Sequence, residues 1–354
     1  MLDEIREQPA ALERTLRSGL SAGAKLAKAV AVKRPRLIVL TARGTSDNAA
    51  QFGRYLLEIM TGIPVSLAAP SVITVYQTPL DLAGAMVVAI SQSGESTDTN
   101  LVLEHAKAQG ALTVGITNEA GSTLAGLAEH VFLVKAGKER SVAATKTYTG
   151  QLLLLYMVAH ALGARIRLDD LRAIPEWAAA ALSLEPAVGE RAERYRFMER
   201  AVVMGRGLNY SNAQEFALKL KETCYVVAEG FSSADFLHGP IAMVEPSLPL
   251  FLFAPCGSTW PGVEDVLVRL ERLSAETLLI TDVANPAAAA RQRAIVIPAW
   301  LGRKRRAEKW SGPEDLYTPI PYIIPAQLFA AALAEKKGLN PDRPRTLSKV
   351  TRTL

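Results

Sequence analysis

The sequence has 354 residues, of which 49% are hydrophobic and 21% charged, and its formal net charge is +5. This length predicts two hydrophobic cores, and this composition excludes a disordered chain. Prolines interrupt the apolar stretch over 317–333, which argues against a membrane span. Met1–Arg6 is mixed in charge and only two cysteines occur. We therefore expect a reduced, cytoplasmic setting with no membrane attachment.

A first helix is predicted near Asp3–Leu16. After it, continuous apolar runs alternate with helical patterns, which predicts parallel sheets covered by helices on both faces. The predicted strands of the first half are Arg36–Thr41, Ala85–Ile90, one whose last residues are 115–118, and one at 132–134. Those of the second half are Arg200–Met204, Leu248–Phe253 and Leu279–Asp282. Residues 145–199 are predicted to be helical, and Pro341–Arg345 to form a non-helical tail.

One unit of this pattern occurs twice, at an offset of about 164 positions. The matching residues are Asn48, Phe52 and Glu58 in the first copy and Asn212, Phe216 and Glu222 in the second. Several matches in order predict a duplicated α/β domain. Open sheets of this kind bind ligands at the carboxyl ends of their strands, so the residues that follow strands are the candidates for ligand contacts.

The segment Ser91–Thr99 follows a predicted strand and opens a helix. Four hydroxyl residues fall within seven positions around Gly94. An ordinary helix cap needs one hydroxyl. This density of hydroxyls at a helix N-terminus, beside a glycine that allows close backbone approach, favours a phosphate-binding turn. No Gly-Lys-Ser/Thr follows, so the segment is not a Walker loop.

Two further segments carry hydroxyls in comparable places. Gly44-Thr45-Ser46 follows the first strand and would line the same crevice. Ser141–Thr147 opens the helix after the 132–134 strand, where helix capping and ligand contact explain the pattern equally well.

Glu215, Lys219 and Glu222 occur at i, i+4 and i+7 in the first helix of the second copy, so they share one face. A solvated charged face is the simpler explanation. The functional alternative is that this helix begins at the ligand-binding edge of the sheet. A partly buried Glu222 on it could then move a proton.

His238 lies in a Gly-Pro turn, and a role in proton transfer stays open for it. His105, His130 and His160 fall in helices or at a strand edge and are expected to be structural. Lys349 lies in the polar tail, where a solvated lysine is the usual case. The histidines are scattered and no Cys-x-x-Cys occurs, so we expect no metal site.

The net positive charge is compatible with nucleic acid or with small anionic ligands. The densest basic cluster, Arg303–Arg306, is interpreted as a solvated loop, because no recognised nucleic-acid-binding pattern accompanies it. We expect no nucleic-acid partner.

Together these motifs resemble the sugar isomerase (SIS) domain family, in particular the isomerase half of the glucosamine-6-phosphate synthases. The matching segments are Met1–Pro9, Ser91–Ser96, Ala217–Glu222, Leu237–Pro240 and Asp342–Lys349. The resemblance implies two tandem SIS domains in a homodimer, each a flavodoxin-like five-stranded parallel sheet with helices on both faces. The implied divisions are an N-terminal helical segment (1–27), SIS domains (28–165 and 195–338), a helical linker (166–194) and a tail that reaches the active site (339–354).

The resemblance also implies roles for individual residues. Phosphate and sugar contacts fall on Gly44, Thr45, Ser46, Ser91, Gln92, Ser93, Ser96, Val142 and Ala144. Glu222 would be the base that moves a proton between C1 and C2, with Lys219 beside it. His238, donated across the dimer interface, would assist ring opening, and Lys349 would reach the open-chain carbonyl and could form a Schiff base. No cofactor is implied.

Two departures bear on the substrate. The synthase pattern has Cys where Arg43 stands and Ser where Ala144 stands. We also expect the protein to lack a glutaminase half. We therefore expect deamination of an amino hexose phosphate, with glucosamine 6-phosphate giving fructose 6-phosphate and ammonia. The alternatives are synthesis of glucosamine 6-phosphate from free ammonia or with a separate glutaminase subunit, removal of an amine from a fructosamine phosphate, and a sugar-phosphate sensor without turnover.

Overall fold

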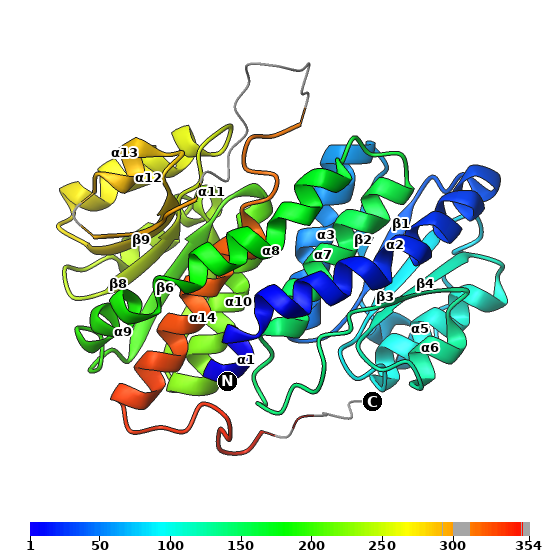
Figure 1. Ribbon diagram of the computed structural model, residues 1–354, viewed down its shortest axis with the longest axis horizontal. Helices are drawn as coiled ribbons and strands as arrows, with labels where there is room; N and C mark the ends of the chain where they lie inside the picture. Colours follow the sequence, from blue (N-terminus) through cyan, green and yellow to red (C-terminus); the bar gives the residue numbers. More distant parts are fainter. Residues whose placement is uncertain (292, 300–311, 348, 350–354) are drawn as a thin grey trace. The chain divides into compact units, whose positions relative to one another are not determined.

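The computed structural model describes residues 1–291, 293–299, 312–347 and 349 (Figure 1). The described residues divide into two compact units, each built around one sheet. The N-terminal sheet unit comprises Ala10–Glu139, Ala144–Ala173 and Lys349. The C-terminal sheet unit comprises Met1–Pro9, Arg140–Ala143 and the described part of Ile174–Leu347. The basic cluster at 303–306 lies outside the described residues.

The N-terminal sheet has five parallel strands in the order β2-β1-β3-β4-β5. They are β1 (Ile38–Thr41), β2 (Val65–Leu67), β3 (Met86–Ile90), β4 (Leu112–Thr117) and β5 (His130–Leu133). This is the flavodoxin-like order, and it confirms the predicted five-stranded parallel sheet. Every residue of β1, β3 and β4 is buried, as expected for apolar strands covered on both faces.

Helices surround this sheet. They are α2 (Gln8–Lys33), α3 (Thr45–Thr61), α4 (Ser71–Thr74), α5 (Thr97–Ala108), α6 (Thr123–Leu127) and α7 (Lys146–Ala161), and α8 (Leu168–Leu182) continues into the other unit. Helix α3 packs on α7, whereas α5 packs on α4 and α6.

The single helix predicted near Asp3–Leu16 is wrong in its bounds, because the chain forms α1 (Leu2–Arg6) and then α2. Pro9 has no backbone N–H and cannot continue α1, but it fits the first turn of α2.

The C-terminal sheet repeats the same order, because β10-β9-β8-β6-β7 is the flavodoxin-like order counted from β6. Its strands are β6 (Arg200–Gly205), β7 (Val227–Ser232), β8 (Pro249–Phe253), β9 (Glu276–Asp282) and β10 (Ala294–Ile297). Its helices are α1, α9 (Glu185–Glu193), α10 (Tyr210–Cys224), α11 (Ser233–Phe236), α12 (Trp260–Arg272), α13 (Pro286–Ala289) and α14 (Pro319–Lys336), with 3₁₀ turns at Gly207–Asn209 and Pro240–Met243. The predicted duplication is confirmed.

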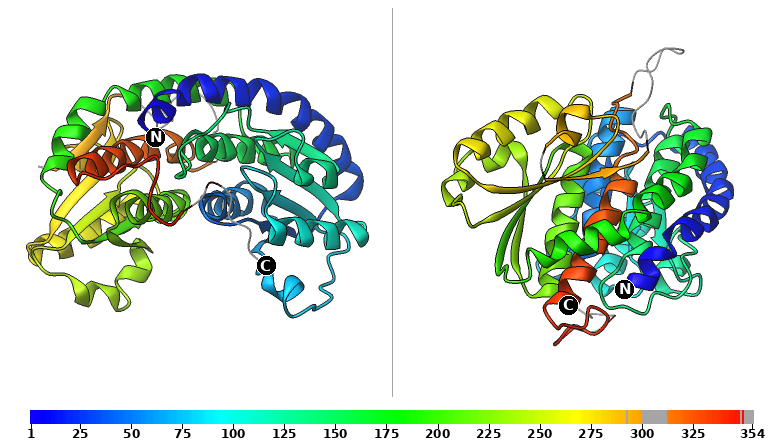
Figure 2. Two further views of the ribbon diagram at one scale, coloured as in Figure 1. Left: turned by 90° about the horizontal axis from the view of Figure 1, so that it is seen from below. Right: turned by 60° about the vertical axis from the view of Figure 1, so that its left-hand side comes forward.

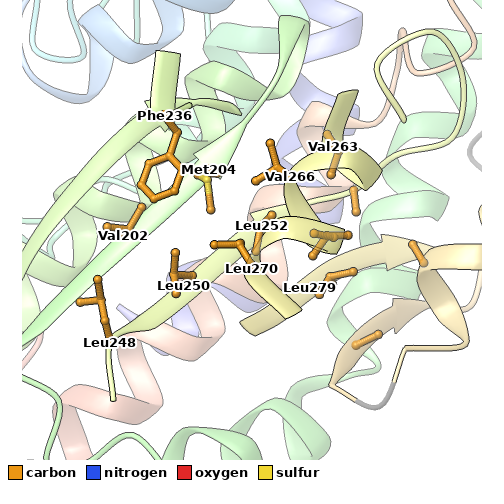
Figure 3. Close-up of a cluster of buried hydrophobic side chains, with 14 residues drawn as sticks. Val202, Met204, Phe236, Leu248, Leu250, Leu252, Val263, Val266, Leu270 and Leu279 are labelled. Carbon is orange, nitrogen blue, oxygen red and sulfur yellow. The ribbon is translucent and has the colours of Figure 1, made fainter. Parts of the chain in front are cut away.

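Side chains alternate across the C-terminal sheet because successive strand residues point to opposite faces. On one face, Leu250 and Leu252 of β8 pack with Val266 of α12 (Figure 3). On the other face, Phe251 contacts Phe216 of α10 and Phe329 of α14, each with ring centroids 5.1 Å apart. In the right view of Figure 2, α12 (yellow) and α14 (orange) lie on opposite faces of the sheet.

The apolar stretch with three prolines forms one continuous helix, α14. Pro319 and Pro321 fall in its first turn, where the missing N–H groups have no helical partner to lose, and Pro325 lies inside the helix. Within the part of the chain that the structure describes, no helix is both long and apolar enough to cross a membrane.

Candidate functional site

The turn Ser91–Ser96 joins the end of β3 to the start of α5. Ser91 Oγ accepts a hydrogen bond from the backbone N–H of Gly94 at 3.1 Å, and Ser93 Oγ accepts one from the N–H of Glu95 at 3.3 Å. A hydroxyl that accepts in this way keeps its own proton to donate. The turn therefore presents hydroxyl donors at a helix N-terminus, which is a suitable arrangement for binding an anion.

Glycine is required at position 94. Its φ is +69°, and an added Cβ would come within 2.1 Å of Ser122 Oγ. The carbonyl of Gln92 accepts from the backbone N–H of Asn118 at 3.1 Å, which fixes the turn to the chain that follows β4. The turn is therefore held both by hydrogen bonds within it and by its contacts with Ser122 and Asn118.

Ser96 occupies the N-cap position of α5 but makes no capping hydrogen bond with its side chain. Its Oγ lies 3.0 Å from Thr99 Oγ1 instead. Side-chain capping of α5 therefore does not explain the serine at this position.

Gly44, Thr45 and Ser46 lie at the same edge of the N-terminal sheet, because β1 and β3 are adjacent parallel strands. Gly44 takes the N-cap position of α3 with φ +57°. Ser46 is buried, and its Oγ accepts from Gln151 Nε2 of α7 at 2.9 Å. The structure thus brings the two predicted ligand turns of this unit together at the carboxyl ends of neighbouring strands.

The start of α7 is capped by Glu139, which the sequence analysis missed. Thr145 holds the N-cap position without a side-chain capping bond. The carboxylate of Glu139 accepts from the backbone N–H groups of Thr145 (2.7 Å) and Thr147 (3.4 Å) and from both hydroxyls. No simple pattern would have found it, because the capping carboxylate comes six residues before the N-cap.

Lys349 also contacts Glu139. Its Nζ lies 3.6 Å from Glu139 Oε2, and its side chain is 27% exposed while that of Glu139 has no exposed area. The usual expectation of a solvated tail lysine is therefore wrong here. Ala144, half-buried, lies between Glu139 and the start of α7 in the chain.

In the C-terminal sheet unit, Ser141 and Val142 are held by α1 and by the tail. Glu4 Oε2 accepts from the N–H of Ser141 at 3.2 Å. Ser141 Oγ donates to the carbonyl of Pro341 at 3.3 Å, and the N–H of Val142 donates to the carbonyl of Asp342 at 3.4 Å. The segment that carries Val142 is thus fixed from both sides.

Glu215, Lys219 and Glu222 of α10 do not form a solvated face, and that explanation is wrong. Glu215 and Lys219 have no exposed side-chain area, and Glu222 is 22% exposed. Lys219 Nζ lies 3.3 Å from Glu215 Oε1 and 2.6 Å from Glu222 Oε2. Burial acts to lower the pKa of Lys219, but the two carboxylates outweigh it and raise the pKa above its ordinary value.

The position of Glu222 along α10 also differs from the expectation. The helix begins after β6, at the carboxyl edge of the C-terminal sheet, but Glu222 lies in its last turn. The residue that follows α10, Tyr225, accepts from the backbone N–H of Arg345 at 2.8 Å. The tail therefore passes the end of the helix on which Glu222 lies.

His238 belongs to the same unit as Glu222 but to a different element. It is exposed, in the turn after α11, and its N–H donates to the carbonyl of Asp235 at 3.0 Å. His105 and His160 each lie 3.0 Å from a backbone carbonyl oxygen, as structural histidines often do.

A cavity of about 540 Å³ opens at the amino ends of β6, β8 and β9, and none of the predicted site residues lines it. Its Glu276 is paired with Arg194 at 2.8 Å and Arg293 at 2.5 Å. Over the described ranges, no three or more His, Cys, Asp and Glu side chains gather closely enough to hold a metal ion.

The fold defines a class: a duplicated flavodoxin-like α/β protein, with a hydroxyl-rich turn at the carboxyl edge of its first sheet. A sequence profile described as SIS domain matches residues 32–161 and 196–299, one match for each sheet. The chain belongs to the SIS domain family.

Similar proteins point to one branch of this family. The isomerizing glutamine–fructose-6-phosphate aminotransferase of Pyrococcus horikoshii is 36% identical over 99% of this chain and 57% of its own length. The Arabidopsis thaliana enzyme of that name, number 1, is 33% identical over 100% of this chain and 54% of its own length. This chain thus spans somewhat over half the length of these curated relatives.

Among solved structures, the C-terminal domain of glucosamine-fructose-6-phosphate aminotransferase from Francisella tularensis superposes with a TM-score of 0.85 and 28% identity, covering 97% of this chain and 98% of that one. Glucosamine-6-phosphate deaminase from Thermotoga maritima has a TM-score of 0.72 at 21% identity, covering 96% of this chain and 99% of that one, and shares the fold.

Proposed function

We propose that this protein is a phosphosugar isomerase that acts on an amino hexose phosphate, converting glucosamine 6-phosphate and water into fructose 6-phosphate and ammonia. Membership of the SIS family and the aminotransferase relatives support the coarser part, a phosphosugar isomerase. In this proposal the Ser91–Ser96 turn, with Thr45 and Ser46, binds the phosphate and so fixes the sugar for reaction.

The observation that carries the proposal is the state of Glu222. Its carboxylate is partly exposed and lies 2.6 Å from a fully buried ammonium, that of Lys219. Such a carboxylate has a fixed position and one accessible side. In the open-chain sugar it would take the proton from C2 and return it to C1, while one proton of the C2 ammonium passes to the C1 carbonyl oxygen. This leaves a hydroxymethyl group at C1 and an iminium at C2. Water then adds at C2 and ammonia leaves. A positioned base typically contributes about 10²- to 10⁴-fold in rate.

The other predicted residues complete the proposal. Lys349 would contact the open-chain carbonyl, and His238, donated across a homodimer interface, would assist ring opening. A cytoplasmic location belongs to the same proposal.

Mixing Glu222→Gln chains with His238→Ala chains tests the shared site, because mixed dimers should regain part of the turnover that each variant lacks alone.

The test of the reaction is a panel of aminosugar phosphates, with ammonia and ketose phosphate as readouts. Glu222→Gln should lower turnover at least about 100-fold. Glu58→Gln is the matched control, because Glu58 holds the corresponding position in the first copy and accepts from the N–H of Val65 at 3.0 Å. Absence of turnover by the wild type across the panel would contradict the proposal.

A second candidate is the reverse reaction, synthesis of glucosamine 6-phosphate from fructose 6-phosphate and ammonia. It is favoured by the names of the relatives above 30% identity, which are aminotransferases. Initial rates in both directions, with ammonium as the nitrogen source and with a glutaminase subunit, distinguish the two. Turnover of a fructosamine phosphate alone would favour an enzyme that removes the amine from that substrate. Binding of sugar phosphates without any turnover would favour a sensor.

A further inference from the structure

Arg43 stands between the two turns at the carboxyl edge of the N-terminal sheet. It follows β1 and precedes Gly44. Its Nε donates to Asp98 Oδ2 at 3.0 Å, and its Nη2 contacts the same oxygen. Asp98 lies in the first turn of α5, two residues after Ser96, and so at the helix start that follows the phosphate turn.

The two partners differ in exposure. The side chain of Asp98 is 3% exposed, whereas that of Arg43 is 49% exposed. A nearly buried carboxylate therefore fixes the direction of a guanidinium whose far side remains accessible. Arginine has five N–H donors in a planar fork, and the pair with one oxygen of Asp98 engages Nε and Nη2. Donors on the accessible side suit a second anion.

A second carboxylate responds to the same guanidinium. Partial desolvation raises the pKa of Asp47, an exposed residue in the first turn of α3, and the charge of Arg43 acts to lower it. Without Arg43, two carboxylates would stand at the starts of the helices that border this edge. Glu95 is directed elsewhere, because its carboxylate accepts from the N–H of Thr123 at 2.9 Å and from its hydroxyl at 2.8 Å.

We propose that Arg43 is a phosphate-binding residue of this edge, oriented by Asp98, and that it adds charge-assisted hydrogen bonds to those from the Ser91–Ser96 turn. The inference rests on the proposed function, because it assigns the phosphate of the sugar to this turn. It makes Arg43 a determinant of affinity for phosphorylated over unphosphorylated sugars.

The test measures the dissociation constants of inorganic phosphate and fructose 6-phosphate for the full chain by calorimetry. Arg43→Met should weaken both by about 10- to 100-fold, the usual range for a hydrogen bond to a charged group. Arg43→Lys keeps the positive charge but loses the planar guanidinium. Its dissociation constants should lie between those of Arg43→Met and the wild type. Asp98→Asn should weaken binding less than Arg43→Met, because the guanidinium remains but loses its fixed direction.

The double variant Arg43→Met/Asp98→Asn distinguishes a direct contact of Arg43 with the phosphate from mere neutralisation of the Asp98 charge. If Arg43 contacts the phosphate, the double variant binds as weakly as Arg43→Met. Recovery to the wild-type constant would overturn the inference, since Arg43 would then only neutralise Asp98. Wild-type affinity of Arg43→Met, or weakening for fructose 6-phosphate but not for inorganic phosphate, would overturn it as well. A wild type that binds neither ligand would refute the proposed phosphate turn itself, and the inference with it.

Discussion

Lys219→Met tests the interpretation of α10 directly. The substitution removes the ammonium and keeps a long apolar side chain. Lys219 Nζ lies 3.3 Å from Glu215 and 2.6 Å from Glu222, and neither Lys219 nor Glu215 has any exposed side-chain area. In the variant, Glu215 would keep a carboxylate in the core of the C-terminal sheet unit without this ammonium beside it.

The expected loss in the free energy of unfolding is about 3–5 kcal/mol, the usual result of removing one partner of a buried ion pair. The pKa of Lys219 lies above its ordinary value of 10.5, because the carboxylates outweigh burial. A raised lysine pKa gives stability that is fully present below about pH 10.5 and is lost as the pH rises through the folded-state value. A measurement at pH 7 therefore captures the whole contribution.

The assay is urea denaturation at pH 7, followed by tryptophan fluorescence. All four tryptophans fall at or after position 177, and Trp177 and Trp260 belong to the C-terminal sheet unit. Glu215→Gln/Lys219→Met removes both charges and should recover more than half of the loss. A cost below about 1 kcal/mol for Lys219→Met, or a double variant no more stable than the single one, would refute the reasoning.

Three further variants test other parts of the structure. Gly94→Ala should lower stability by about 1–3 kcal/mol and abolish phosphate binding, because its Cβ would clash with Ser122, whereas Gly121→Ala meets nothing within 4 Å and should leave the melting temperature unchanged. Burial raises the pKa of Asp282 from 3.8 to about 6, so the wild type should lose about 3 kcal/mol as the pH rises from about 4 to 6.5, and unfolding curves of Asp282→Asn should lack that loss. Glu139→Gln should cost about 2 kcal/mol in urea denaturation, because its neutral amide accepts more weakly from the start of α7, and an unchanged midpoint would argue against the cap.

Seven strands of the two described sheets could be predicted from the sequence because each is a local property of an apolar run, whereas β2, β7 and β10 were missed. Five buried residues in β3, for example, leave little choice of structure. The break between α1 and α2 was within reach too, because Pro9 marks it. The cap of α7 was not, since Glu139 reaches it through a loop whose path no local rule sets.

The burial of the α10 charges shows the same limit. A spacing of i, i+4 and i+7 gives a shared face, but what covers that face is decided elsewhere in the chain. Helix α14, about one hundred residues later, packs on α10, and Cys224 Sγ donates to the carbonyl of Ala330 at 3.2 Å. The sequence therefore predicted which residues lie together and missed whether water reaches them.

The two copies of the fold differ in the turn that would bind an anion. In each copy, six residues join the third strand of the flavodoxin-like order to the next long helix: Ser91–Ser96 in the first and Ala254–Thr259 in the second. The fourth residue is a glycine with positive φ in both, Gly94 at +69° and Gly257 at +101°. A glycine with positive φ thus stands at the same place in both turns.

The surroundings of the second turn nevertheless oppose an anion. A Cβ on Gly257 would lie 2.8 Å from Cβ of Glu314, and Thr259 Oγ1 donates to Asp315 Oδ2 at 3.0 Å. Asp315 is 2% exposed, and its carboxylate takes the hydroxyl that a ligand would need. We therefore expect calorimetry with inorganic phosphate to give one site per chain, lost in Gly94→Ala. Two equivalent sites would contradict this division of roles, in which the first copy binds the phosphate and the second supplies the buried charges of α10.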